Sequence, residues 1–148
     1  MNTILLVEDE DNDVLFLQHS FAKSGLATPM QRVADGRQAI DYLAGNGSFA
    51  NRDKHPLPCL VLLDLNLPHK TGFEVLTWIR AQPDLRGMIV IVLTSSRVEA
   101  DIVKAYSLHA NSYIVKPSKP KELAEFAVLI RDYWLRWNQT PQAFSGCE

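Results

Sequence analysis

Hydrophobic residues along the chain form short unbroken runs, separated by longer segments in which apolar and polar positions mix. The clearest runs are Ile4–Val7, Leu60–Leu63 and 88–93, with shorter ones at Met30–Val33 and Ser112–Val115. Runs of four or five aliphatic and β-branched residues are typical of strands buried on both faces of a parallel sheet. The pattern therefore predicts five buried strands.

Between the runs, apolar residues recur at the three- or four-residue spacing of amphipathic helices. The first such segment spans residues 11–24, carries Val14, Leu17 and Phe21, and ends at Gly25. The equivalent residues of the next three segments are Ala39, Ile40 and Leu43, then Val75, Leu76 and Ile79, and then Val98, Ile102 and Ala105. A fifth helix follows the last run. This alternation predicts an α/β fold with a doubly wound five-stranded parallel sheet and helices on both faces.

Length and composition restrict the class of protein. The 148 residues correspond to one domain, which we expect at 1–138, with 139–148 as a short tail and no output domain. A net charge of -2 gives no electrostatic case for nucleic acid, and no apolar run approaches the roughly 20 residues that span a bilayer. The N-terminus shows no signal peptide. We interpret Cys59 and Cys147 as free thiols of a cytoplasmic protein.

Polar side chains stand where the predicted strands end. Glu8 and Asp9 follow the first run, Asp64 ends the third, Thr94 follows the fourth and Lys116 follows the fifth. The carboxyl ends of parallel strands share one edge of an open sheet, where ligands bind. We therefore expect these five residues to form one site, and their chemistry indicates a metal ion and a phosphoryl group.

The acidic residues of this site require a cation. Two carboxylates about 4 Å apart repel each other by roughly 4 kcal/mol at an effective dielectric constant near 20. Mg²⁺ takes one or two carboxylates and keeps water for substrate phosphate. We expect Asp9 and Asp64 as direct ligands, Glu8 as a direct or water-mediated one, and the backbone carbonyl of Asn66 as a further candidate.

Asp64 is the predicted nucleophile, because an aspartate can attack phosphorus and form an acyl phosphate. Lys116 and Thr94 then bind the remaining phosphoryl oxygens. Taken singly, each of these residues is ordinary: an aspartate after a strand usually caps a turn, and an acidic run usually faces solvent. Their joint occurrence at strand ends favours a site, and His69 is a candidate neighbour.

Four motifs carry a resemblance to a known family: LLVEDE, LVLLDLNLP followed by Gly72, IVLTSS and SYIVKP. With them, nearly the whole chain resembles the flavodoxin-like receiver domain of two-component response regulators. The resemblance implies that Asp64 receives a phosphoryl group from a phosphohistidine of a sensor histidine kinase. Thr71 replaces a residue that is often acidic in the family.

The resemblance also implies roles for the other site residues. The implied Mg²⁺ ligands are Glu8, Asp9, Asp64 and the carbonyl of Asn66. The implied phosphoryl-binding and switch residues are Thr94, Lys116 and Tyr113. The Lys116–Pro117 peptide bond is often cis in the family.

Further segments are similar to one subgroup, the stand-alone receivers that partner bacterial phytochrome histidine kinases. They include ADGRQAIDYL, QPDLR, AYSLHANSYIVKP and the YWL of the last helix. This likeness implies a phytochrome-type kinase as partner and is compatible with a homodimer.

The last predicted helix carries more apolar residues than a single core-facing side needs. One stripe contains Leu123, Ala127, Ile130, Trp134 and Trp137, and further apolar residues at Phe126, Val128, Tyr133 and Leu135 widen it. We expect an interface for a partner or a second copy at Phe126, Tyr133, Trp134 and Trp137. The alternative is that these residues only cover the sheet and the end of the fourth helix.

Two other functions compete with a phosphoacceptor signalling protein. A phosphohydrolase similar to the haloacid dehalogenase superfamily also uses a strand-end aspartate, but it needs a second aspartate two positions later, where this chain has Asn66. A receiver-like structural module that takes no phosphate is the third possibility. We expect no enzyme activity beyond slow self-dephosphorylation.

Overall fold

The computed structural model describes residues 3–145. A five-stranded parallel sheet forms its centre, in the order β2-β1-β3-β4-β5. The strands are β1 (Ile4–Val7), β2 (Met30–Val33), β3 (Leu60–Leu63), β4 (Val90–Thr94) and β5 (Ser112–Val115). This architecture confirms the predicted doubly wound α/β fold.

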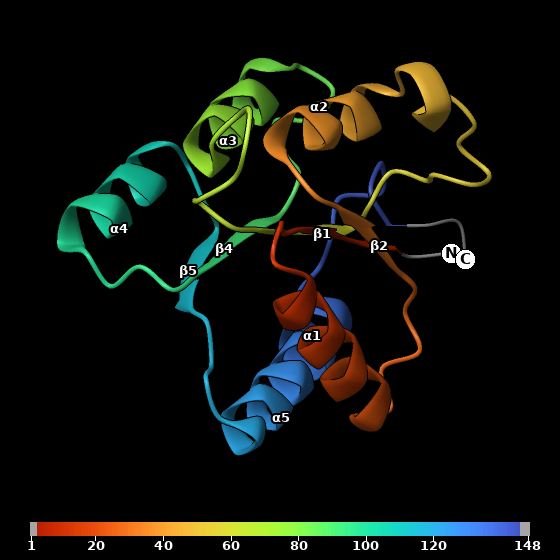
Figure 1. Ribbon diagram of the computed structural model, residues 1–148. Coiled ribbons are helices and arrows are strands. Elements are labelled where there is room, and N and C mark those ends of the chain that lie inside the picture. Colours follow the sequence, from red (N-terminus) through yellow and green to blue (C-terminus); the bar gives the residue numbers. More distant parts are fainter. Residues whose placement is uncertain (1–2, 146–148) are drawn as a thin grey trace.

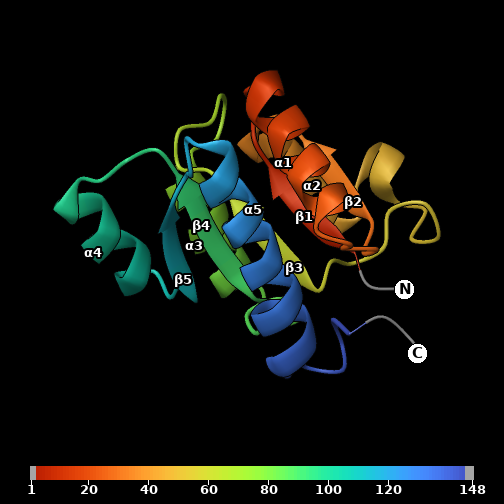
Figure 2. The same cartoon turned by 90° about the horizontal axis from the view of Figure 1, so that it is seen from below.

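Helices cover both faces of the sheet (Figures 1 and 2). One layer contains α1 (Asp11–Lys23) and α5 (Pro120–Leu129), which continues as η2 (Ile130–Trp137). The opposite layer contains α2 (Gly36–Ala44) and α3 (Gly72–Ala81), and the short η1 (Gly47–Phe49) follows α2. The remaining helix, α4 (Glu99–Ser107), lies beyond the β5 edge of the sheet.

The strand order places the site at the centre of the sheet. The chain winds outward from β1 to β2 and then returns to β3 on the other side of β1, so the order reverses between β1 and β3. The register pairs Val7 with Leu63, and the N–H of Asp64 donates to the carbonyl of Val7 at 3.1 Å. Glu8 and Asp64, which follow these paired residues, therefore lie at the same edge.

Helix α4 packs less tightly than expected. Of the three residues predicted to face the core, only Ala105 is buried, while Ile102 is half-buried and Val98 is 58% exposed. Because α4 lies beyond the last strand, little sheet surface is available for it to cover. The residues of β5 are themselves only half-buried.

The last helix departs from regular α geometry at Ile130, where the π-helical segment η2 begins. The step of seven residues from Ile130 to Trp137 would make about two full turns in an α-helix, which would place both side chains on the same face. In a π-helix, where each hydrogen bond reaches five residues along the chain, the same step rotates through less than two turns. Ile130 is therefore buried and Trp134 partly buried, whereas Trp137 turns away and is 69% exposed.

Phe126 corrects the predicted interface. Its side chain is only 5% exposed and belongs to the core, where its ring centroid lies 6.0 Å from that of Phe21 in α1. Phe126 therefore holds α5 against α1 and is not available on the surface.

The predicted tail is also packed more closely than expected. The segment after η2 turns back at Pro141, and Phe144 is buried in the core on the α2 and α3 side, close to Gly87. Residues up to 145 thus contribute to the domain, whereas 146–148 lie outside the described residues.

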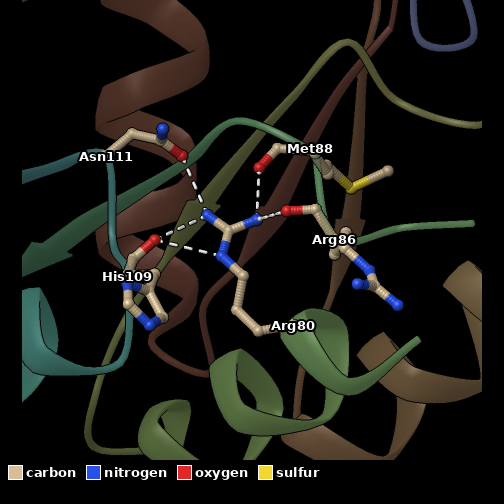
Figure 3. Close-up of a pocket in the computed structure, with 6 residues that line it drawn as sticks. Arg80, Arg86, Met88, His109 and Asn111 are labelled. Atoms are coloured by element: carbon tan, nitrogen blue, oxygen red, sulfur yellow. Dashed lines mark hydrogen bonds between the residues drawn. The ribbon is translucent and has the colours of Figure 1, made fainter. Parts of the chain in front are cut away.

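At the amino ends of β4 and β5, Arg80 joins three segments (Figure 3). Its guanidinium donates to the carbonyls of Arg86 and Met88 at 2.8 and 2.7 Å, to the carbonyl of His109 at 2.8 and 3.0 Å, and to Oδ1 of Asn111 at 2.9 Å. A guanidinium has five N–H donors, so these bonds use all of them. The adjoining pocket of about 320 Å³ therefore has no free donor on Arg80 to offer a ligand.

Candidate functional site

Three acidic side chains meet at the carboxyl edge of the sheet. Glu8 and Asp64 are buried and Asp9 is exposed. Each contributes a carboxylate oxygen, and these oxygens lie within 4.8 Å of one another. The structure thus brings together the acids that the sequence placed at the ends of β1 and β3.

Lys116 lies among the carboxylates. Its Nζ is 2.6 Å from Oε2 of Glu8, 3.0 Å from Oδ2 of Asp64 and 3.0 Å from Oδ2 of Asp13. The lysine follows β5, whereas Asp13 lies in the first turn of α1. Asp13 is a site residue that was not predicted from the sequence.

Burial and charge shift the ionisation of this group. Burial raises the pKa of Glu8 to about 7, although the hydrogen bond from Lys116 lowers it, and the charge of Asp64 adds to the rise. Burial alone would lower the pKa of Lys116, but the nearby carboxylates outweigh it and raise that pKa above its ordinary value. The lysine is therefore charged, whereas Glu8 is easily protonated unless a further cation is present.

Thr94 and Tyr113 lie on the adjoining strands β4 and β5, and Tyr113 pairs with Val92, two residues before Thr94. Thr94, the last residue of β4, is fully buried, and its carbonyl accepts the backbone N–H of Lys116 at 2.8 Å. The Tyr113 hydroxyl donates to the carbonyl of Ser96 at 3.0 Å, in the loop after β4. The two predicted switch residues thus border the same loop.

The loop after β3 fits closely around Asp64. Asn66 is exposed, and its N–H donates to Oδ1 of Asp64 at 3.4 Å. A Cβ on Gly72 would lie 2.2 Å from the carbonyl oxygen of Asp64, so only glycine allows α3 to begin here. His69 is exposed in this loop with a left-handed φ of 65°.

The resemblance to receiver domains implied that the Lys116–Pro117 peptide bond is often cis. No cis peptide bond occurs within residues 3–145, so the Lys116–Pro117 bond is trans.

Arg32 in β2 is a second site residue that was not predicted from the sequence. It donates to the carbonyl of Glu8 at 2.9 Å and to that of Asp9 at 3.2 Å, and it pairs with Asp11 at 2.9 Å. These bonds fix the backbone of the loop that presents the acid pair. No sequence signal distinguishes this arginine, because it occupies an ordinary position in a short strand.

A groove between α1 and α5 opens beside the site. Its inner part, of about 250 Å³, is lined by Asp13, Lys116 and Pro117 together with apolar residues. Its outer part, of about 600 Å³, continues past Phe16 and Leu123. Phe16 is 59% exposed, so an apolar surface lies directly next to the charged group.

The donor set fits a hard divalent cation. Carboxylate oxygens are ligands that Mg²⁺ and Mn²⁺ accept, and the negative charge of the three acids exceeds what one lysine neutralises.

Among the helices of residues 3–145, none has the length and apolar character that a membrane span requires.

Comparison with known proteins identifies relatives over most of the chain. The probable methanogenesis regulatory protein FilR2 of Methanothrix harundinacea is 39% identical over 141 residues, which cover 93% of this chain and 86% of FilR2. The response regulator Rcp1 of Synechocystis sp. is 39% identical over 140 residues, covering 95% of this chain and 93% of Rcp1.

Solved structures agree with these relationships. The phosphorylated cyanobacterial phytochrome response regulator RcpA is 38% identical with a TM-score of 0.87, covering 95% of this chain and 98% of that one. The Mn²⁺-bound form of Rcp1 is 37% identical with a TM-score of 0.85, covering 95% and 99%. A metal therefore binds a receiver of this type.

The family model of the response regulator receiver domain matches residues 4–127. This match contains all the strands and the whole acidic site. It spans well over half of the chain, and the relatives named above are two response regulators, of which RcpA is a phytochrome response regulator, and a probable methanogenesis regulatory protein. The chain therefore belongs to the response regulator receiver family.

Proposed function

We propose that Asp64 is the phosphoacceptor of this receiver and that Glu8, Asp9 and Asp64 hold Mg²⁺ during phosphoryl transfer. The observation that supports this assignment is the position of Asp64 between the acid pair and Lys116, whose Nζ lies 3.0 Å from Oδ2 of Asp64. The carbonyl of Asn66 is the further proposed metal ligand.

In the proposed reaction, a carboxylate oxygen of Asp64 attacks the phosphorus of a phosphohistidine. The bond from phosphorus to the imidazole nitrogen breaks, and its electron pair returns to the imidazole. Glu8, Asp9 and Asp64 would hold a divalent cation, which would neutralise charge on one phosphoryl oxygen. Lys116 donates to a second oxygen, and Thr94 donates its hydroxyl to a third, which draws the loop after β4 toward the site and allows Tyr113 to follow.

The proposed role is that of a signalling protein, in which the acyl phosphate is lost only slowly. Position 66 holds an asparagine, so no carboxylate stands two residues after Asp64 to activate water for turnover. This departure is the reason for preferring a phosphoacceptor over a phosphohydrolase.

The test of the phosphoacceptor is intact mass after incubation with acetyl phosphate. We expect one hydroxylamine-labile adduct of a phosphoryl group that requires Mg²⁺ and is absent from Asp64→Asn. An adduct that persists in Asp64→Asn would contradict the assignment.

The proposed phosphoryl donor is a sensor histidine kinase of the phytochrome type, because the similar RcpA is a phytochrome response regulator. FilR2, whose name refers to methanogenesis and not to phytochrome, is as similar in sequence as Rcp1. The phosphotransfer test should therefore also include histidine kinases that are not phytochromes. A donor helix can reach Asp64 along the groove between α1 and α5, where it would cover Phe16.

Phe16→Ala tests this docking route. We expect it to slow phosphotransfer from the kinase at least tenfold and to leave labelling by acetyl phosphate unchanged, because the small donor does not need the groove. Val103→Ala is the control, since Val103 on α4 is 55% exposed, close to the 59% of Phe16. Equal loss with both donors would show that Phe16 acts on the site and not on docking.

We further propose that η2 forms a homodimer surface through Tyr133, Trp134 and Trp137. Tyr133 and Trp137 are exposed, and Trp134 stacks edge-on against Tyr133 with ring centroids 5.0 Å apart. Exposed aromatic residues are enriched in interfaces. Sedimentation of the native chain and Trp137→Ala, with and without phosphorylation, tests this surface; a native chain that stays monomeric throughout would remove the proposal.

A further inference from the structure

The ammonium group of Lys116 has no hydrogen left for another partner. It carries three hydrogens, and three carboxylates surround it: Glu8 at 2.6 Å, Asp64 at 3.0 Å and Asp13 at 3.0 Å. Glu8 and Asp64 belong to the proposed metal and phosphoryl site. Asp13 belongs to α1 and approaches from the side of the groove.

Asp13 differs from the other two carboxylates in exposure and in its bonds. Its side chain is 39% exposed, against 2% for Glu8 and 6% for Asp64. Glu8 also accepts the backbone N–H of Glu10 at 3.0 Å, and Asp64 accepts that of Asn66. Among the described residues, the Asp13 carboxylate bonds only to Lys116. Its position is therefore set by the lysine that it contacts.

A phosphoryl group on Asp64 would compete for the same ammonium. To donate to a phosphoryl oxygen, Lys116 must release one of its present partners. Glu8 and Asp64 lie in the acidic cluster itself, so the contact on the outer side, with Asp13, is the one that can be given up without disturbing that cluster.

We propose that Asp13 is a positioning residue that restrains Lys116 in the unphosphorylated protein and thereby weakens the binding of a phosphoryl group. This inference rests on the proposed phosphoacceptor function of Asp64. Asp13 acts on the site in two ways, because its carboxylate holds the ammonium and its negative charge repels the incoming anion.

The size of the effect follows from the geometry. Asp13 and Asp64 each contact the same nitrogen at 3.0 Å, so their contacting oxygens lie no more than about 6 Å apart. The Asp13 side chain is partly exposed, so an effective dielectric constant of about 40 to 80 applies, and over that distance a unit charge then changes the affinity for an anion by about three- to tenfold. Loss of the Asp13 charge should tighten anion binding by that factor.

The experiment uses beryllofluoride, an anionic analogue of a phosphoryl group, with the full chain at saturating Mg²⁺. Its dissociation constant, measured by fluorine NMR, is compared among the native chain, Asp13→Asn, Asp13→Glu and Glu10→Gln. We expect three- to tenfold tighter binding by Asp13→Asn and native-like binding by Asp13→Glu, which keeps the charge. Glu10→Gln is the matched control, because Glu10 is exposed beside α1 and its side chain has no contact with Lys116 among the described residues.

A second measurement separates positioning from a general effect on α1. Without ligand, the side-chain NMR signals of Lys116 should shift in Asp13→Asn and stay in place in Glu10→Gln, because only the first loses a partner of the ammonium. Thermal melting of each variant verifies that it is folded.

The outcomes are distinct. Unchanged or weaker binding by Asp13→Asn, with normal binding by the native chain, overturns the restraining role and leaves the phosphoacceptor intact. A native chain that binds no beryllofluoride and gains no phosphoryl adduct overturns the phosphoacceptor itself.

Discussion

The charged side chains at the amino and carboxyl edges of the sheet differ in how completely they are paired. At the amino edge, the guanidinium of Arg80 donates all its hydrogens to carbonyl and amide oxygens. At the carboxyl edge, the single ammonium group of Lys116 contacts Glu8, Asp13 and Asp64. Asp9 lies close to Glu8 and Asp64 but has no ion pair with Lys116 among the described residues. The first arrangement is complete without a ligand, whereas the second has an excess of negative charge. One edge is therefore suited to holding the fold, and the other to responding to a cation or a phosphoryl group.

The comparison predicts the largest loss of stability at the amino edge. Arg80→Met removes five hydrogen bonds and deprives the carbonyls of Arg86, Met88 and His109 of this donor, whereas Oδ1 of Asn111 keeps the N–H of Val90. The loss should lower the free energy of unfolding by roughly 3 to 4 kcal/mol. Urea unfolding measures this change, and Arg86→Met is the control because its exposed side chain lines the same pocket. The affinity of the folded protein for Mg²⁺ should not change; a loss of affinity would show that the edges are coupled.

Phe144 offers a second test of the same edge. Phe144→Ala should lower the free energy of unfolding by about 2 to 3 kcal/mol, somewhat less than is usual for a buried phenylalanine, since the C-terminal segment can detach and leave little cavity. Chemical unfolding of this variant and of Gln142→Ala, an exposed neighbour, measures the difference. Equal stability of the two variants would mean that the segment does not pack in solution.

At the carboxyl edge, stability should depend on pH through Glu8. Its pKa is about 7 in the folded protein and 4.5 in the unfolded chain. Folding therefore favours the protonated form: this contribution is fully present below pH 4.5 and is lost as the pH rises through about 7. Without metal, the native chain should lose roughly 1 to 3 kcal/mol relative to Glu8→Gln between these limits.

The same titration with saturating Mg²⁺ provides the control. A bound cation stabilises the ionised form of Glu8, so the native chain should no longer lose stability as the pH rises. Parallel curves for the native chain and Glu8→Gln without metal would contradict the raised pKa.

Arg32 should show the smallest effect on stability and a clear effect on binding. Arg32→Met removes the bonds to the carbonyls of Glu8 and Asp9, which should lower the free energy of unfolding by about 1 kcal/mol. Because those bonds orient the acid pair, we expect the affinity for Mg²⁺ to fall about tenfold. Calorimetric titration compares this variant with Arg37→Met, whose side chain is exposed; equal affinities would remove the positioning role of Arg32.

Much of the fold and of the site was predictable because both depend on short-range patterns. Strand ends are visible as the end of an apolar run, and parallel strands place those ends together, so Glu8, Asp64 and Lys116 converge without knowledge of the helices. Such an argument needs only the type of each residue and its place in a run.

Contacts that depend on geometry between elements were not predictable. Asp13 is one of several acids in a polar segment, and Arg32 is an ordinary residue of β2; only the packing of α1 and β2 beside the site gives them their contacts. The change to π geometry at Ile130 follows from no pattern of apolar residues in the sequence. With regular α geometry, Phe126 and Trp137 were predicted to lie on the same surface. The burial of Phe144 likewise depends on the path of the chain after η2.

The π-helical geometry of η2 has a consequence for how variants of this chain should be compared. A π segment accommodates one more residue than an α-helix of the same number of hydrogen-bonded turns, so it behaves like a single-residue insertion. Deleting one residue between Ile130 and Trp137 would permit ordinary α geometry and rotate every later side chain by about a quarter of a turn or more. Length in this segment, and not only residue identity, then determines which aromatic side chains reach the solvent.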